Sequence, residues 1–252
     1  MTALAPERAA VLGCEIDRVR MSDAVARCDE FVRERTGARY MAVNASKVVL
    51  MRRDPELRRA GDCELVTADG QAVVWASRLL GDPLPERVAG IDLMCELLSL
   101  AERRGYRVYL LGARADVLER AVERIRERHP RLRLAGRHHG YLSAEDEPAV
   151  VAAVRAAAPD LLFVGMPSPR KERFLSRWGG ELDVPFAMGV GGSIDVLAGL
   201  TRRAPWIWQR LGMEWAYRLI QEPRRLFGRY LSTNCAFLAM TAGELWRRRR
   251  RR

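Results

Sequence analysis

Short apolar runs alternate with amphipathic stretches through most of the chain. Apolar runs of strand length lie at 40–43, 64–68, 107–111, 132–135, 161–165 and 185–190. Between these runs, residues 115–128 and 148–158 place apolar side chains three and four positions apart, with charges on the opposite face, as an amphipathic helix does. The pattern predicts a repeated strand and helix arrangement.

The composition of the predicted strands indicates how they are arranged. Because they are apolar almost without interruption and are linked by helices, they favour a largely parallel sheet with helices on both faces, an α/β fold of the Rossmann-like type. Ligands of such folds bind beyond the carboxyl ends of the strands. Three strand ends are suited to this role, at 111–113, 164–169 and 189–193.

The pattern changes after residue 200. Four of the six tryptophans, at positions 206, 208, 215 and 246, lie in this last part among arginines, and six consecutive arginines follow at 247–252. Of the formal net charge of +11, ten charges fall on residues 201–252, which carry 13 arginines and three glutamates. We therefore predict a Rossmann-like catalytic domain over residues 1–200 and a basic, aromatic-rich helical appendage over residues 201–252.

The predicted appendage has three interpretations. Aromatic rings beside arginines suit the interface of an anionic membrane, and residues 231–246 are apolar enough to lie there but too short to cross. A terminal helix packed on the core fits the composition equally well. A nucleic-acid patch is a third alternative, which ranks lower because the rest of the sequence contains no recognisable nucleic-acid module.

Other sequence features indicate the cellular setting. No apolar run approaches the roughly 20 residues of a membrane-spanning helix, and residues 1–8 lack the pattern of a secretory signal. The five cysteines are scattered without a C-x-x-C pair, which favours reduced thiols. We expect a cytoplasmic protein that is peripheral on the inner face of the cell membrane.

A glycine-rich turn follows the strand predicted at 185–190. Gly191, Gly192 and Ser193 precede a predicted helix, so their N–H groups and the helix dipole can bind a diphosphate. A tight turn without a ligand is an equally good interpretation. The spacing matches neither G-x-G-x-x-G nor the P-loop G-x-x-x-x-G-K-[ST], which disfavours a dehydrogenase and a P-loop protein.

Acidic and amide side chains occupy other predicted strand ends. Asp69 comes directly after the strand at 64–68, where its carboxylate can accept a proton from an attacking hydroxyl group, although a helix N-cap is the commoner role of such an aspartate. Asn44 ends the first strand in the same way, and Asp195 is placed to reach the ribose of a nucleotide. Taken singly, each is more often a cap or turn residue.

The sequence predicts no metal site. The three histidines are clustered, and no D-x-D pair is present to hold a metal ion against a diphosphate. A metal-independent transferase would neutralise its leaving group with cations and backbone amides. Arg87, Lys171 and the arginines of the appendage are the candidate cations.

Taken in order, these motifs resemble the WecG/TagA/CpsF glycosyltransferases from about residue 40 to residue 230. The matching stretches are 43–44, 50–57, 68–70, 87–93, 110–112, 159–165, 169–172, 189–195, 203–205, 211–215, 217–219 and 221–223. One such match alone is weak, but many in the same order are specific.

The resemblance implies an inverting, metal-independent transfer that needs no cofactor. The donor would be a UDP-sugar of the N-acetylmannosamine type or a hexose, and the acceptor a sugar on a polyprenyl diphosphate, in cell-surface polysaccharide synthesis. The other implied partner is an anionic membrane surface, with no nucleic acid, and a homo-oligomer is left open.

The resemblance also implies a role for individual residues. Asp69 becomes the general base for the acceptor hydroxyl group. Asn44 and Arg87 line the pocket, Tyr141 and Asp195 lie on the nucleotide side, and Arg218 and Arg225 reach the donor diphosphate. The implied substrate-binding residues are Asn44, Arg87, Gly112, Tyr141, Gly165, Lys171, Glu172, Gly191, Gly192, Ser193, Asp195, Arg218 and Arg225.

Three positions depart from the family pattern. Ala42 replaces a threonine, Lys171 replaces a glutamine, and Gly228 replaces one of two adjacent arginines. Because the first two positions face the sugar or the acceptor, the donor sugar stays open. Two rival functions also stay open: a nucleotide-sugar-binding protein without transferase activity, and a nucleic-acid-binding module centred on the arginine tail.

Overall fold

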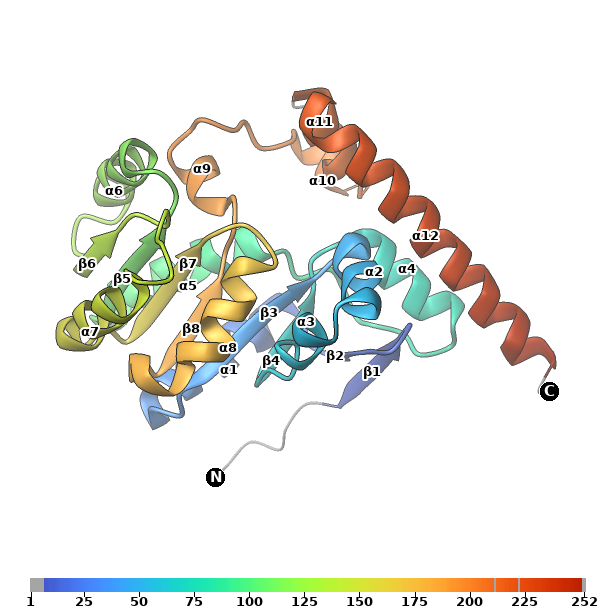
Figure 1. Cartoon of the computed structure of the whole chain (residues 1–252), viewed down its shortest axis with the longest axis horizontal. Coiled ribbons are helices and arrows are strands. Elements are labelled where there is room, and N and C mark those ends of the chain that lie inside the picture. The colour runs from blue at the N-terminus through green and yellow to red at the C-terminus, as the bar shows by residue number, and fades with distance from the viewer. Residues whose placement is uncertain (1–6, 211, 222, 251–252) are drawn as a thin grey trace.

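The computed structural model describes residues 7–210, 212–221 and 223–250, without the side chains of residues 224–226 and 229 (Figure 1). The strands are β1 Arg8–Val11, β2 Cys14–Asp17, β3 Ala38–Val43, β4 Leu65–Ala68, β5 Arg107–Gly112, β6 Arg133–His138, β7 Leu161–Gly165 and β8 Phe186–Gly189. The helices are α1 Met21–Glu34, α2 Ala45–Arg53, α3 Pro55–Arg59, α4 Gln71–Leu79, α5 Gly90–Arg104, α6 Ala115–Arg128, α7 Glu147–Ala157, α8 Arg170–Leu182, α9 Ser193–Leu197, α10 Trp206–Arg210, α11 Glu214–Gln221 and α12 Pro223–Arg250.

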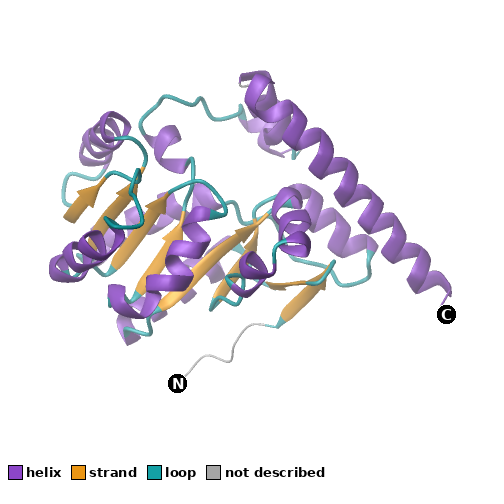
Figure 2. Cartoon of the chain, in the orientation of Figure 1, coloured by secondary structure: helices purple, strands orange, loops and turns teal. Residues whose placement is uncertain are grey.

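Six strands form one sheet in the order β4-β3-β8-β7-β5-β6, and every neighbouring pair is parallel. All six carboxyl ends therefore lie at one edge of the sheet. Helices cover both faces (Figure 2). The structure confirms the predicted α/β Rossmann-like fold.

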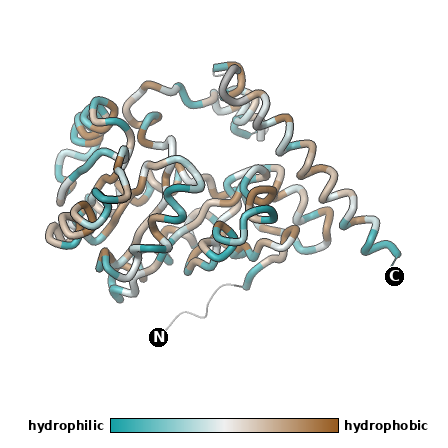
Figure 3. Tube along the Cα trace, viewed as in Figure 1, coloured by the Kyte–Doolittle hydropathy of each residue, from teal (hydrophilic) through white to brown (hydrophobic). Residues whose placement is uncertain are grey.

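Alternate residues of the central strands belong to opposite hydrophobic layers. In β7, Leu161 and Phe163 pack with α1, α5, α6 and α9, while Leu162 and Val164 pack with α7 and α8. Because both faces are buried, these strands are apolar at successive positions, which is the pattern seen in the sequence. Figure 3 shows hydrophobic and hydrophilic residues alternating along the helices, and a hydrophilic end of α12.

The predicted boundaries agree closely with most elements. The segments predicted at 161–165 and 115–128 coincide with β7 and α6. The strand predicted at 132–135 is observed as β6, which continues to His138 because this edge strand pairs only with β5 and tolerates polar residues such as Arg137.

An antiparallel hairpin of β1 and β2 lies outside the sequence prediction. Leu12 and Gly13 form its turn with positive φ angles of 53° and 85°, as a tight two-residue hairpin requires. The hairpin lies against β4, where the buried Asp17 carboxylate accepts the N–H of Val66 at 2.6 Å and a bond from Arg8 Nε at 2.9 Å. Its strands of four residues are too short to show a clear sequence period.

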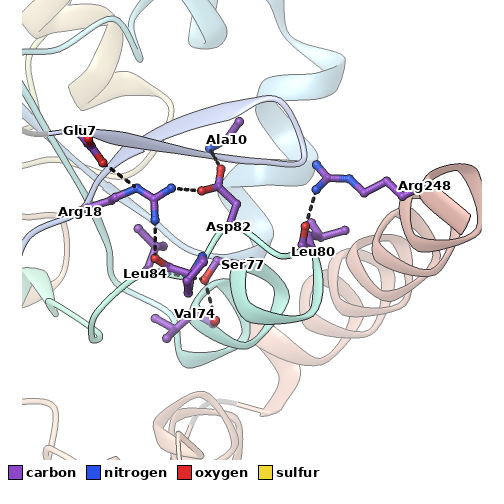
Figure 4. A network of polar contacts seen from close by, with 10 residues as sticks. Glu7, Ala10, Arg18, Val74, Ser77, Leu80, Asp82, Leu84 and Arg248 are labelled. Carbon is purple, nitrogen blue, oxygen red and sulfur yellow. Dashed lines mark hydrogen bonds and ion pairs between the residues drawn. The ribbon is translucent and has the colours of Figure 1, made fainter. Parts of the chain in front are cut away.

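Polar contacts join the hairpin, α4 and α12 (Figure 4). Asp82 lies after α4, accepts the N–H of Ala10 at 2.8 Å and pairs with Arg18. Arg248, near the end of α12, donates to the carbonyl oxygen of Leu80. The end of α12 is therefore held against the α4 region.

Helix α12 packs on the core along one side and exposes apolar residues on the other. Phe237 is 3% exposed and belongs to the hydrophobic cluster beneath α2 and α4. Leu231, Leu238 and Trp246 of the same helix are more than half exposed. The alternative of a packed terminal helix thus describes one side of α12. The domain boundary between residues 200 and 201 stays a prediction.

Among the residues that the structure describes, none of the helices is both long enough and apolar enough to cross a membrane.

Candidate active site at the carboxyl edge of the sheet

Four neighbouring strand ends carry the residues that the sequence singled out. Asp69 follows β4, Asn44 follows β3, and residues 191–193 follow β8, while Gly165 ends β7. Residues widely separated in the sequence are thereby brought to one edge of the sheet. Such an edge is where open α/β sheets bind their ligands.

Asp69 is half-buried and is held at both its backbone and its side chain. Its N–H donates to the carbonyl oxygen of Val43 at 2.9 Å, and its Oδ1 accepts the N–H of Gly90 at 2.9 Å. The side chain does not cap α4, whose N-cap is Gly70. It binds the first turn of α5 instead. The second carboxylate oxygen has no hydrogen bond with a described residue, so it is available to a substrate.

The segment around Val88, which precedes Gly90, is held by hydrogen bonds to β4. Val88 donates its N–H to Ala68 at 2.9 Å, and Thr67 Oγ1 donates to the carbonyl oxygen of Val88 at 3.2 Å. The Tyr40 hydroxyl lies 2.7 Å from Thr67 Oγ1. Burial strongly raises the pKa of Tyr40, and the nearby charge of Asp69 adds to this. Tyr40 is therefore a neutral support beneath the site.

Asn44 is the N-cap of α2, because its Oδ1 accepts the N–H of Lys47 at 3.0 Å. A side chain in this role still has its amide Nδ2 to donate. Gly70 passes close by, and a Cβ added there would lie 3.2 Å from the Cβ of Asn44. Glycine at position 70 therefore allows the ends of β3 and β4 to approach.

Three glycines bring the ends of β5, β6 and β7 together. Gly112 has a φ of 137°, and a Cβ there would lie 2.5 Å from the Cα of Gly165. A Cβ on Gly140 would lie 2.8 Å from the Cα of Gly112. Gly112 is thus required by packing between strand ends, and Gly165 by the Ile194 side chain of α9, which a Cβ there would overlap, whether or not a substrate contacts them.

Replacing Gly112 with alanine is expected to lower the free energy of unfolding by about 3 kcal/mol, because overpacking and backbone strain act together. Urea unfolding of the purified variant measures this loss. Gly180→Ala is the control, since Gly180 lies within α8 with open space at its Cβ position. That control should be stable or slightly stabilised, and equal stability of both variants would contradict the packing argument.

Two buried lysines share one buried glutamate below the ends of β3 and β8. Lys47 Nζ lies 2.7 Å and Lys171 Nζ 2.9 Å from Oε1 of Glu172, and the three side chains line a small pocket with Ala42 and Gly189. Glu172 Oε2 is buried without a hydrogen bond. The cluster carries one excess positive charge. Sequence reasoning missed Lys47, whose only signal is a lysine among apolar residues of α2.

Burial and charge shift the pKa values of this cluster. Desolvation, aided by the charge of Lys47, lowers the pKa of Lys171 to about 8. Burial by itself raises the pKa of Glu172, but Lys47 and Lys171 outweigh it and lower that pKa to about 2. Glu172 is therefore ionised at neutral pH, and Lys171 loses its proton more readily than an exposed lysine.

The lowered pKa of Lys171 predicts a pH dependence of stability. In the folded state Lys171 releases its proton near pH 8, whereas an unfolded lysine does so near its ordinary pKa of 10.5. Between these values the unfolded chain binds more protons, so this residue makes the free energy of unfolding rise with pH. Urea unfolding from pH 7.5 to 10 should show a rise relative to Lys171→Met, and parallel profiles would contradict the assignment.

Arg87 faces the appendage. Its Nη1 lies 3.0 Å from Oε2 of Glu214 at the start of α11, and the side chains of this ion pair are 16% and 14% exposed. Arg218, also on α11, is half-buried and forms no ion pair with a described residue. The backbone of Arg225 lies in α12, but its side chain falls outside the described residues.

The residues that the resemblance assigns to a nucleotide lie at the other half of the edge. Tyr141, after β6, is 69% exposed, and Oδ2 of Asp195 lies 3.6 Å from the position of a Cβ on Gly192. Arg114, after β5, was missed by sequence reasoning. Its two bonds to Asp116 raise its pKa most, and the nearby Tyr141 and Asp195 raise it further. Arg114 therefore lies in the neighbourhood of Tyr141 and Asp195.

Within the described ranges, no group of three or more histidine, cysteine, aspartate or glutamate residues is arranged to hold a metal ion.

Known proteins resemble the chain across both the sheet and the C-terminal helices. The model of the glycosyl transferase WecG/TagA/CpsF family matches residues 9–251. The N-acetylglucosaminyldiphosphoundecaprenol N-acetyl-beta-D-mannosaminyltransferase of Staphylococcus aureus strain MW2 is 34% identical over 219 residues, which cover 86% of the chain and 85% of that protein. Proteins of the same name from strains NCTC 8325 / PS 47 and MRSA252 show the same identity and coverage.

Proposed function

The chain belongs to the WecG/TagA/CpsF family of glycosyltransferases, and from this premise we propose that it transfers N-acetylmannosamine from a UDP-sugar to N-acetylglucosamine on a polyprenyl diphosphate. The activity for which the Staphylococcus aureus relatives are named supports the transferred sugar and the acceptor. The product would serve the synthesis of a cell-surface polymer.

The observation that carries the proposed mechanism is the fixed carboxylate of Asp69. Its Oδ1 is held by the N–H of Gly90, which leaves the other oxygen for an acceptor hydroxyl group. As that hydroxyl oxygen attacks the anomeric carbon, its proton passes to Asp69 and the bond from the sugar to the UDP oxygen breaks. A single displacement of this kind inverts the anomeric centre.

The departing UDP gains negative charge, which cations and backbone amides of this chain would stabilise. The buried cluster of Lys47, Lys171 and Glu172 contributes one excess positive charge beside the end of β8. Arg218 and Arg225 of the C-terminal helices supply further charge in this proposal, so no metal ion is required. Arg114, Tyr141 and Asp195 would contact the nucleotide.

The C-terminal helices are proposed to contact an anionic membrane on the cytoplasmic side, where the lipid-linked acceptor lies. Their exposed apolar side chains support this: Trp206, Ile207, Met213, Trp215, Ile220, Phe227, Leu231, Leu238 and Trp246. Arginines at 247–250 would add attraction to anionic lipids, worth about 1 kcal/mol for each residue near the surface.

The direct test is an assay with UDP-N-acetylmannosamine and a short polyprenyl-diphosphate-linked N-acetylglucosamine, in the presence of EDTA. Mass spectrometry should detect a disaccharide lipid, and NMR should show a β linkage. UDP-N-acetylglucosamine and UDP-glucose test the donor. Donor binding without product from any sugar would favour an inactive binding protein, and a requirement for divalent metal would overturn metal independence.

A second assay separates membrane from nucleic-acid binding. Flotation with vesicles containing phosphatidylglycerol should retain the protein at physiological salt. Retention on DNA should be weak there, because phosphate contacts to DNA weaken steeply with salt. The opposite result would favour the nucleic-acid alternative for the arginine-rich segment.

A further inference from the structure

One short stretch of chain, residues 87–92, forms a hydrogen bond to the proposed base and ion pairs with the C-terminal segment. Within it, Gly90 donates its N–H to Asp69, and Val88 is bonded to β4. The stretch also contains two charged side chains, Arg87 and Asp92, that form no hydrogen bond or ion pair with Asp69. Arg87 forms an ion pair with Glu214, and Asp92 forms one with Arg203.

The two ion pairs lie on either side of Gly90. Arg87 binds Glu214 at 3.0 Å, and Asp92, in the first turn of α5, binds Arg203 at 2.5 Å. Arg203 precedes α10 in the loop that follows α9, and in Figure 1 this loop runs on the side of the molecule where the strand arrows end. Two points of attachment restrain both the position and the orientation of residues 87–92.

Packing also holds the C-terminal segment near residues 87–92. Ala204, beside Arg203, is 3% exposed. Gly212, beside the α11 start, lies so close to α4 that a Cβ there would be 2.5 Å from the Cβ of Gln71. Gln71 is the first residue of α4 and lies two positions after Asp69. Arg203 therefore lies against the start of α5 and Gly212 against the start of α4, the two neighbours of the base.

We propose that Arg203 and Glu214 are positioning residues whose ion pairs with Asp92 and Arg87 clamp the C-terminal segment onto residues 87–92 and so fix Asp69 and Arg87 for transfer. This inference rests on the proposed function. It assigns the appendage a mechanical role at the base, separate from any contact of its arginines or apolar side chains with lipid or diphosphate.

The clamp acts on geometry more than on stability. The side chains of the Arg203–Asp92 pair are 29% and 32% exposed, so this pair contributes little to folding, whereas the Arg87–Glu214 pair, at 16% and 14%, is largely buried. A shift of about 1 Å in a reacting group, by contrast, lowers the rate about 100-fold. Breaking the Arg203–Asp92 pair should therefore lower kcat while leaving the melting temperature nearly unchanged.

A charge exchange tests the clamp. Asp92→Arg and Arg203→Asp should each lower kcat at least 10-fold, and the double variant should recover most of the loss because the ion pair is restored with the charges reversed. Glu214→Gln should also lower kcat, with Arg87 retained. The control is Arg104→Ala, which removes the pair with Asp29 at the far end of α5 and should leave kcat unchanged.

Hydrogen exchange provides a readout that does not depend on turnover. The amide of Gly90 should exchange faster in Asp92→Arg and in Arg203→Asp, and return towards the native rate in the double variant. If native protein transfers no sugar, the proposed function fails while the exchange data still test the clamp. Normal kcat and normal exchange in the single variants, or no recovery in a stable double variant, would overturn it.

Discussion

Asp69→Asn is expected to reduce kcat by about 10²–10⁴-fold, the usual contribution of general acid and base catalysis. Asparagine can still accept the Gly90 N–H through its amide oxygen, so the start of α5 should stay in place. It cannot take up the proton of the acceptor hydroxyl group. The loss should therefore appear in kcat, measured at saturating donor and acceptor, with little change in donor affinity.

Asp62→Asn is the matched control. Asp62 is an exposed aspartate that lies just before the start of β4, whereas Asp69 lies just after its end. It should retain native kcat. Calorimetry of UDP-sugar binding and thermal unfolding should be similar for all three proteins. Native kcat in Asp69→Asn, with folding and binding unchanged, would show that another group takes the proton.

Glu172→Gln is expected to have the largest effect on stability. Glu172 is 5% exposed and is the shared partner of Lys47 and Lys171. Removing one member of a buried ionic cluster costs about 3–5 kcal/mol, because the remaining charges are left uncompensated. Urea unfolding at pH 7 should show a loss in this range.

Glu56→Gln is the control for this effect. Glu56 pairs with Arg173 at 3.0 Å, but its side chain is 54% exposed, so the change should be at most about 1 kcal/mol. The double variant Glu172→Gln with Lys171→Met should be more stable than Glu172→Gln alone, since one uncompensated charge is gone. If Glu172→Gln were as stable as the native protein, the ion pairs of Glu172 with Lys47 and Lys171 would not contribute to folding.

Local sequence patterns predicted the sheet well and pointed to several candidate residues that the fold brings to its carboxyl edge. The strands that form the central sheet are apolar over consecutive residues, so their positions and their parallel pairing follow from composition. Asp69 was identified because it directly follows one of these strands. Its partner, however, is Gly90, 21 residues away, and no local pattern indicates that bond.

The features that sequence reasoning missed depend on contacts between distant segments. Lys47 and Glu172 are 125 positions apart, and Arg87 and Glu214 are 127 positions apart. A charged residue in the sequence is normally expected at the surface, so burial of such a pair can be recognised only once the fold brings the partners together. The same holds for Arg114, which has no distinguishing neighbours in the sequence.

The buried carboxylate of Asp17 also affects how copies of this chain meet in solution. β4 is an edge strand, and edges of this kind can recruit strands of other molecules into aggregates. The outward N–H of Val66 donates to the Asp17 carboxylate, and the hairpin covers this edge of the sheet. At the opposite border, β6 presents the exposed charges of Arg133 and Arg137. Both borders are therefore unsuited to adding strands, which protects a crowded enzyme from amyloid-like association.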